Sequence, residues 1–191
     1  MRRAALLPLV LVALAGCRAP APAPAPAAKP DPRPITSPSV APVDGPVPFH
    51  VHLDAGERLS TSSPRAGACP ALSTRIIGRD GNVLIAAYGA DCPVSGNGSP
   101  GNGRHGVYRT SADIPSSRTT TSATTPLGDA TLFEQPYYEC TNSCQHYTEP
   151  VAVIALSAPA GQAIRALVVV AERGSLDLAG LQALVTRRLT P

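Results

Sequence analysis

A proline-rich stretch near the amino terminus does most to limit where this chain can fold. Residues 20–48 contain 11 prolines among 29 residues. Proline lacks an amide N–H and restricts the residue before it, so this stretch is unsuited to a helix or a sheet ladder. We expect residues 18–48 to form a polyproline II spacer that rises about 3.1 Å per residue and reaches at most roughly 90 Å. The folded part is then a single globular domain, residues 49–191.

The residues before the spacer have the charged start and the apolar run of a signal peptide, residues 1–17. The run is too short to be a permanent membrane-spanning helix. Its last four residues, Leu14 to Cys17, resemble the lipobox of bacterial lipoproteins. This resemblance implies that Cys17 receives a lipid with acyl chains such as palmitate and becomes the new amino terminus. We therefore expect an extracytoplasmic protein that is lipid-anchored to the cell membrane. The alternative is an ordinary cleaved secretory signal in which Cys17 is incidental.

Four further cysteines follow the spacer: Cys69, Cys92, Cys140 and Cys144. An even number of cysteines in an exported domain indicates two disulfides, for which three connectivities exist. We favour Cys69–Cys92 and Cys140–Cys144, because the first bond would close the open end of a hairpin predicted at residues 74–88. The loop-entropy estimate gives roughly 3.4 kcal/mol of stabilisation for the first bond and about 2 kcal/mol for the second.

The second cysteine pair lies in the segment YYECTNSCQHY, residues 137–147, and raises the choice between a redox centre, a metal site and a structural disulfide. Redox pairs are typically C-x-x-C at a helix start, whereas this pair is C-x₃-C between β-like sequences. Zinc would need a second Cys or His pair, and the candidates are His146 and the distant His50 and His52. A structural disulfide at a loop tip is the preferred interpretation. We expect three tyrosines around it to face a partner: Tyr137, Tyr138 and Tyr147.

Hydrophobic periodicity predicts mostly strands in the remaining sequence. The expected strands and hairpins cover residues 49–53, 74–88 with a turn at Asp80-Gly81, 106–114, 130–139 with 151–156, and 164–171. Leucines at helical spacing after Ser175, the expected N-cap, predict a C-terminal amphipathic helix. The predicted fold class is therefore α+β, a mainly antiparallel sheet of hairpins with this helix packed on one face.

The composition of the predicted domain argues against a nucleic-acid partner. The domain contains 11 arginines and 11 acidic residues, so the +3 formal charge of the whole chain comes from the signal peptide and the spacer. Nucleic acids and anionic lipid headgroups are bound by basic patches, which a neutral domain with interspersed charges does not indicate. We expect no nucleic-acid binding.

The sequence contains no catalytic motif that holds up in its context. A G-x-G-x-x-G pattern at residues 96–101 includes Pro100 and precedes no helix, so we regard it as a chance match. Glu134 and Glu139 could be described as an acid and a base, but carboxylates on a hairpin are usually solvated. We therefore predict no catalytic residue, no cofactor and no metal site, and we favour a non-enzyme while leaving that question open.

The lipobox, the proline-rich tether, the antiparallel sheet and the closing helix together resemble the small cell-envelope lipoproteins of high-GC Gram-positive bacteria. Residues 127–189 are also loosely similar to envelope proteins with a PsbP-like α+β fold. The resemblance implies a membrane-anchored binding or scaffolding domain whose partner is an envelope protein or a small apolar ligand. The alternative is an envelope enzyme, either a hydrolase or a thiol–disulfide exchanger.

Overall fold

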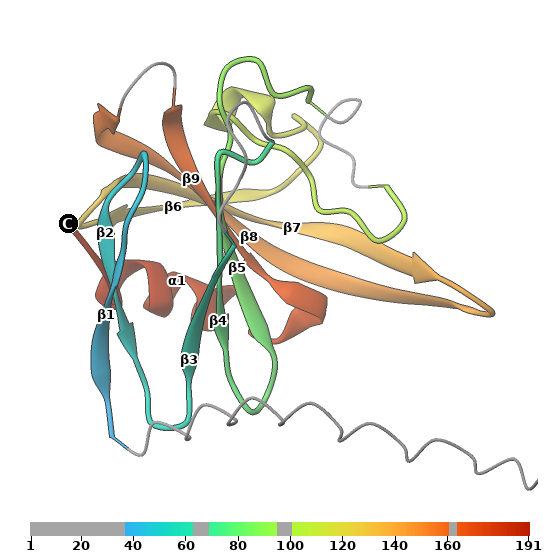
Figure 1. Ribbon diagram of the computed structural model, residues 1–191. Coiled ribbons are helices and arrows are strands. Elements are labelled where there is room, and N and C mark those ends of the chain that lie inside the picture. Colours follow the sequence, from blue (N-terminus) through green and yellow to red (C-terminus); the bar gives the residue numbers. More distant parts are fainter. Residues whose placement is uncertain (1–36, 63–68, 95–100, 161–163) are drawn as a thin grey trace, which may run out of the picture. The chain divides into compact units, whose positions relative to one another are not determined.

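The computed structural model describes residues 37–62, 69–94, 101–160 and 164–191 (Figure 1). All of them belong to one compact unit, residues 33–191. The predicted signal peptide, Cys17, most of the predicted spacer and most of the G-x-G-x-x-G pattern lie outside the described residues.

The fold is mainly β, so the predicted α+β class is wrong. About half of the structure is strand, arranged in two sheets, and α1 (Leu178–Arg187) is the one α-helix in the described part of the chain. The prediction gave too much weight to this helix, which is present and packs on the sheet, and it missed four strands. All four missed strands form sheet edges: β1 (Ser39–Val43), β3 (Arg58–Ser62), β6 (Thr120–Thr125) and β10 (Leu189–Thr190).

The larger sheet has seven strands, and each pairs antiparallel with its neighbours. Between its edge strands β3 and β6, the order is β4 (Leu72–Ile77), β5 (Asn82–Ala87), β9 (Ile164–Ala171), β8 (Cys144–Ala160) and β7 (Gly128–Cys140). The predicted hairpins and the predicted strand at residues 164–171 are confirmed. The predicted strand at residues 106–114 is wrong, since this segment is a loop with one 3₁₀ turn, η2 (Ser111–Asp113).

Side-chain hydrogen bonds explain why residues 106–114 do not join the sheet. The Asp113 carboxylate accepts hydrogen bonds from the backbone N–H groups of Arg109 and Thr110, at 2.8 and 3.1 Å. These bonds satisfy donors that a strand would otherwise direct to a neighbour. The segment instead covers the sheet, and the Tyr108 ring packs edge-on against Phe133 with ring centroids 5.2 Å apart.

The smaller sheet has the order β1, β2 (Phe49–Leu53) and β10 (Leu189–Thr190). Strand β1 lies inside residues 18–48, the predicted spacer, and its Val43 pairs with Phe49. Among the described residues, regular structure therefore begins at Ser39 and not at Phe49. An edge strand tolerates Pro42 because the missing N–H can be the one that would face solvent.

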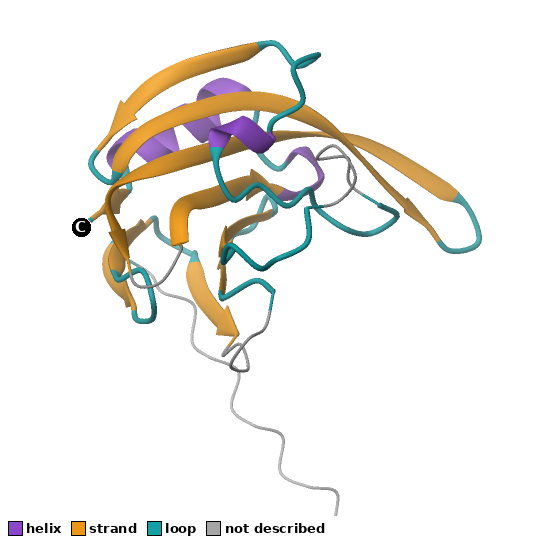
Figure 2. Ribbon diagram, turned by 90° about the horizontal axis from the view of Figure 1, so that it is seen from above, coloured by secondary structure: helices purple, strands orange, loops and turns teal. Residues whose placement is uncertain are grey.

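One face of the larger sheet is covered jointly by the smaller sheet and by α1 (Figure 2). Buried residues from all three meet there, among them Val51, Ile154 and Leu181, each fully shielded from solvent. The opposite face is covered by residues of the connection between β5 and β6. Because β8 and β9 are enclosed on both sides, their continuous apolar runs are explained.

Helix α1 begins later than its predicted N-cap. Asp177 is the N-cap, and its Oδ1 accepts a hydrogen bond from the Gly180 N–H at 2.7 Å. Ser175 instead donates its hydroxyl to the Asn82 carbonyl at 2.8 Å, which ties the connection before the helix to the β4–β5 hairpin. Serine and aspartate are both good caps, so composition did not separate the two positions.

Both predicted disulfides are present. Cys69 and Cys92 are joined with their Cα atoms 5.6 Å apart. Cys140 and Cys144 are joined with their Cα atoms 4.1 Å apart. Disulfides persist in oxidising compartments, so the two bonds are consistent with a location outside the cytoplasm. Within the described ranges, no helix has the length and apolar character needed to cross a bilayer.

The earlier start of the fold leads to a first prediction. Val43 and Val47 are 2% and 4% exposed, and burying a valine contributes about 1.5 kcal/mol or more. A chain that begins at Phe49 should therefore lose roughly 3 kcal/mol of unfolding free energy relative to one that begins at residue 37. Urea denaturation of the two chains measures this difference. Val40→Ala in the longer chain is the control, because Val40 is 54% exposed and should have little effect. Equal stability of the two chains would contradict the role of β1.

Candidate functional site

The two longest strands extend beyond the rest of the sheet as an arm, which we define as residues 134–150. Strand β7 follows β8 in unbroken register as far as the pair Cys140–Cys144. The neighbouring pairings end earlier, with β6 at Phe133 and with β9 at Val151. The arm projects as the long orange hairpin in Figure 1, with the disulfide at its tip. The sequence predicted this hairpin but not that it would leave the sheet.

The tyrosines near the tip do not share one surface, which corrects the prediction for Tyr137. Tyr138 is 36% exposed and lies beside His146 with ring centroids 6.1 Å apart. Tyr137 is only 5% exposed and stacks on His105 at 5.0 Å, while Tyr147 lies near it on the same face. Adjacent strand residues point to opposite faces, so two consecutive tyrosines cannot both face one partner.

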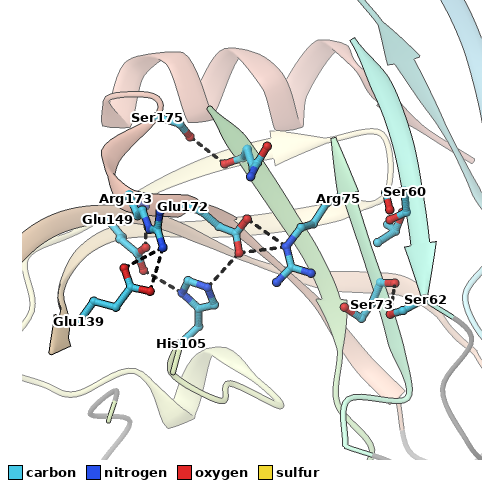
Figure 3. A network of polar contacts seen from close by, with 12 residues as sticks. Ser60, Ser62, Ser73, Arg75, His105, Glu139, Glu149, Glu172, Arg173 and Ser175 are labelled. Atoms are coloured by element: carbon cyan, nitrogen blue, oxygen red, sulfur yellow. Dashed lines mark hydrogen bonds and ion pairs between the residues drawn. The ribbon is translucent and has the colours of Figure 1, made fainter. Parts of the chain in front are cut away.

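A buried carboxylate lies at the base of the arm on its inner face. The Glu149 side chain has no solvent exposure. It accepts hydrogen bonds from His105 Nδ1 at 2.9 Å and from the Arg173 backbone N–H at 2.7 Å (Figure 3). It also accepts one from Gln135 Nε2 at 3.3 Å. Burying a carboxylate is tolerated only when it is paired and hydrogen-bonded, and this one is both.

The network continues from His105 towards β4. His105 Nε2 donates to Glu172 Oε1 at 3.1 Å, and Arg75 Nε donates to both Glu172 oxygens at 3.0 Å. Four side chains thus alternate in charge from the buried end outward: Glu149, His105, Glu172 and Arg75 (Figure 3). We call them the charge relay. It connects β8, the loop before η2, the 3₁₀ turn η3 (Glu172–Gly174) and β4.

The arm has further bonds to its surroundings. The Arg173 guanidinium pairs with the Glu139 carboxylate at 2.7 Å. The Gly103 N–H donates to the Tyr138 carbonyl at 2.9 Å, and the Cys140 N–H donates to Asn102 Oδ1 at 2.7 Å. The backbone edge of β7 that does not pair with β8 is therefore partly bonded to the loop before η2. The ion pair between Arg173 and Glu139 fixes the arm on its inner face.

The relay perturbs the titration of its members. Burial alone would lower the pKa of His105, but the hydrogen bonds and negative charges of Glu149 and Glu172 outweigh it and raise the pKa to about 9. Burial alone would raise the pKa of Glu172, but hydrogen bonds from His105 and Arg75 outweigh it and lower the pKa. At neutral pH the imidazole is therefore a cation that donates from both nitrogens.

This arrangement suits positioning better than catalysis. A general base needs a free nitrogen or carboxylate within reach of a substrate proton. Both nitrogens of His105 are engaged by carboxylates, and Glu149 is shielded from solvent. The interpretation of Glu134 and Glu139 as an acid–base pair also fails, because these residues lie on opposite faces of β7 and Glu139 is paired with Arg173.

The structure also places the histidines that were considered as metal ligands. His50 and His52 lie on the exposed face of β2, as their alternation predicted. A ring nitrogen of His50 lies 3.0 Å from the Pro191 carbonyl oxygen. Across the described ranges, no group of three or more His, Cys, Asp or Glu side chains is arranged to hold a metal ion.

Sequence reasoning missed the charge relay because its members are far apart in the chain. His105 is 44 residues from Glu149 and 67 from Glu172. One local signal was available. Glu149 lies two residues before Val151, where the apolar run of β8 begins, and Glu172 directly follows that of β9. Acidic residues at the ends of strands enclosed on both faces are candidates for burial, and buried carboxylates require partners.

No protein-family model, curated protein or solved structure matches this chain. The resemblance to PsbP-like envelope proteins therefore stays a prediction.

The raised pKa of His105 gives a second prediction. A group whose pKa is higher in the folded than in the unfolded state stabilises the folded state when it is protonated. For His105 this stabilisation is complete below the unfolded-state pKa of 6.5, and it is lost as the pH rises through the folded-state pKa of about 9. The difference amounts to about 3 kcal/mol of unfolding free energy. Urea denaturation between about pH 6 and pH 9.5 should show this fall in the wild type and in His52→Gln, which alters an exposed histidine. It should be absent from His105→Gln; an equal fall there would show that another group is responsible.

Proposed function

We propose that this protein is a lipid-anchored, extracytoplasmic binding protein of the cell envelope that presents the outer face of its arm to another envelope protein. The observation that carries the proposal is the arm itself. It extends beyond the sheet from Phe133 and Val151, where the pairings of β7 with β6 and of β8 with β9 end, and a disulfide closes its tip. The lipobox ending at Cys17 and the proline-rich spacer support the anchoring.

The outer face of the arm has the character of a contact surface. Cross-strand pairs follow one another along it: Pro136 with Thr148, Tyr138 with His146, and Cys140 with Cys144. Tyr138 is one of two large hydrophobic side chains that are exposed in the described part of the chain. Tyrosine offers a large contact area with little conformational entropy to lose, and it is enriched among residues that dominate binding.

Rigidity is the second support for the proposal. The disulfide fixes the tip, while the charge relay and the Arg173–Glu139 ion pair fix the inner side. A contact surface that is already ordered loses less entropy on association. A protein partner suits this exposed ribbon better than the small apolar ligand that was also considered, because a ribbon cannot enclose a small molecule.

Thiol–disulfide exchange is the second candidate function, favoured by the exposed position of the tip disulfide. Redox-active bonds exchange near the glutathione potential, whereas structural ones have lower potentials. Equilibration of the protein against a glutathione series separates the two functions. We expect Cys140–Cys144 to stay oxidised throughout the series, and ready exchange would favour the redox function over binding.

The anchoring part of the proposal predicts the behaviour of Cys17→Ser. Two or more acyl chains give stable membrane attachment, since each buried methylene contributes about 0.8 kcal/mol. The wild type should fractionate with membranes and incorporate labelled palmitate, and Cys17→Ser should do neither. Cys69→Ser with Cys92→Ser is the control for loss of cysteines and should keep the label. A membrane-bound, label-free wild type would contradict lipid anchoring.

The binding part predicts that cross-linking depends on the outer face of the arm. In cells treated with a cross-linker, the wild type should give a defined product, and Tyr138→Ala should reduce it about tenfold or more. Val40→Ala is the matched control, because it trims the other exposed large hydrophobic residue at β1.

Cys140→Ser with Cys144→Ser should also reduce the product while costing only about 2 kcal/mol of stability. If Tyr138→Ala and Val40→Ala gave the same yield as the wild type, the arm would not be the contact surface.

A further inference from the structure

A cleft opens beside the charge relay, at the inner side of the arm. Its volume is about 590 Å³, which is within the range of small-molecule sites. It lies between the β4–β5 turn, the loop before η2 and the η3 turn, and Tyr137 contributes to its wall. Three of its lining residues are glycines, Gly81, Gly103 and Gly174, and a Cβ added at Gly103 would meet nothing within 4 Å.

Arg75 is the residue of the cleft with unused binding capacity. Its Nε donates to both oxygens of Glu172, and neither of its terminal nitrogens has a hydrogen-bond partner among the described residues. Figure 3 shows these two nitrogens pointing away from Glu172. The Arg75 side chain is 42% exposed, so solutes can reach it. A guanidinium offers paired, coplanar N–H groups that match the two oxygens of a carboxylate or a phosphate.

The relay holds this guanidinium in position. Glu172 fixes Arg75, His105 fixes Glu172, and the buried Glu149 fixes His105. The buried end of the relay is capped by the Arg173 backbone N–H and by Gln135. Negative and positive side chains alternate along the relay, and its last member, Arg75, is a cation that lines the cleft. A group that binds next to Arg75 in the same alternation would be an anion.

The other cations of the cleft are held differently. His105 uses both nitrogens within the relay. Arg173 contacts both Glu139 oxygens through Nη2 alone, at 2.7 and 2.8 Å, and its side chain is 57% exposed. Arg75 is less exposed, and its partner Glu172 is itself held by His105. We therefore place an incoming oxyanion at Arg75, whose terminal donors are oriented in advance and have no partner within the described ranges. Such preorganisation lowers the entropic cost of binding.

We propose that the cleft is a binding site for a small extracytoplasmic ligand that bears a carboxylate or phosphate group, which the terminal nitrogens of Arg75 bind in bidentate fashion. This proposal does not depend on lipid anchoring or on the binding of a partner at the outer face of the arm. Asp80, at the β4–β5 turn, also lines the cleft and opposes binding of an anion by charge repulsion.

A single bidentate contact supports weak binding of the simplest probes. A group of four or five non-hydrogen atoms gains at most a few kcal/mol, which corresponds to a dissociation constant of about 1 mM. The experiment is a titration of the ¹⁵N-labelled protein, residues 37–191, with sodium acetate and with sodium phosphate, followed by NMR at constant ionic strength maintained with chloride. We expect saturable shifts for the amides of Gly81, Gly103 and Gly174 and for Arg75 Nε–H. A carboxylate ligand would give tighter binding of acetate, and a phosphate ligand tighter binding of phosphate.

Four variants separate specific binding from general charge effects. Arg75→Gln should abolish the shifts, and Arg75→Lys should weaken binding about tenfold, because lysine keeps the charge but lacks the planar fork. Asp80→Asn should strengthen binding severalfold, and asparagine is as suited as aspartate to the tight turn before Gly81. Arg165→Gln is the matched control, since it removes the same charge from an exposed position of β9 that does not line the cleft.

Absence of saturable shifts in the folded wild type with both probes would overturn the proposal. Equal weakening by Arg75→Gln and Arg165→Gln would also overturn it, because binding would then reflect net charge alone. If Arg75→Gln lost its native amide spectrum, Asp80→Asn would still decide: stronger binding supports the site, and unchanged binding contradicts it.

Discussion

The buried carboxylate of Glu149 is the constraint on which the inner side of the molecule depends. A carboxylate without exposure needs donors on every side, because an unpaired buried charge would cost several kcal/mol. The donors come from three separate parts of the chain: His105, the Arg173 backbone and Gln135. Satisfying one side chain thus brings the loop before η2 and the η3 turn against the arm, and it determines where the cleft opens.

The same demand explains the backbone conformation of η3. Arg173 has a φ of 54°, a left-handed conformation that costs a residue with a side chain about 1 kcal/mol or more. In this conformation its N–H reaches Glu149 at 2.7 Å while its guanidinium pairs with Glu139. Gly174 follows with a φ of 69°, and a Cβ there would lie 3.1 Å from the Thr148 carbonyl oxygen. The local strain is compensated by the bonds that Arg173 makes to the arm.

Local periodicity predicted the parts of the fold whose side chains face a core. Strands β4, β5, β8 and β9 and helix α1 carry continuous or periodic apolar residues, and each was found near its expected place. The edge strands β1, β3 and β6 were missed because an edge needs few apolar residues, and β1 even contains Pro42. Cys69–Cys92 was predicted from the hairpin that it closes, and Cys140–Cys144 from its position at a loop tip. The charge relay instead depends on tertiary contacts over 44 or more residues, which no local pattern encodes.

The alternation of side chains along β7 separates the two surfaces of the arm. Tyr137 turns inward, stacks on His105 and lines the cleft, while Tyr138 turns outward beside His146. A molecule in the cleft and a protein on the outer face would therefore not compete for the same atoms. They would nevertheless share a support, because the bonds that hold Arg75 in place also hold the arm. Weakening the relay at His105 should loosen both surfaces together, whereas a change confined to Tyr138 or to Asp80 should affect one of them alone.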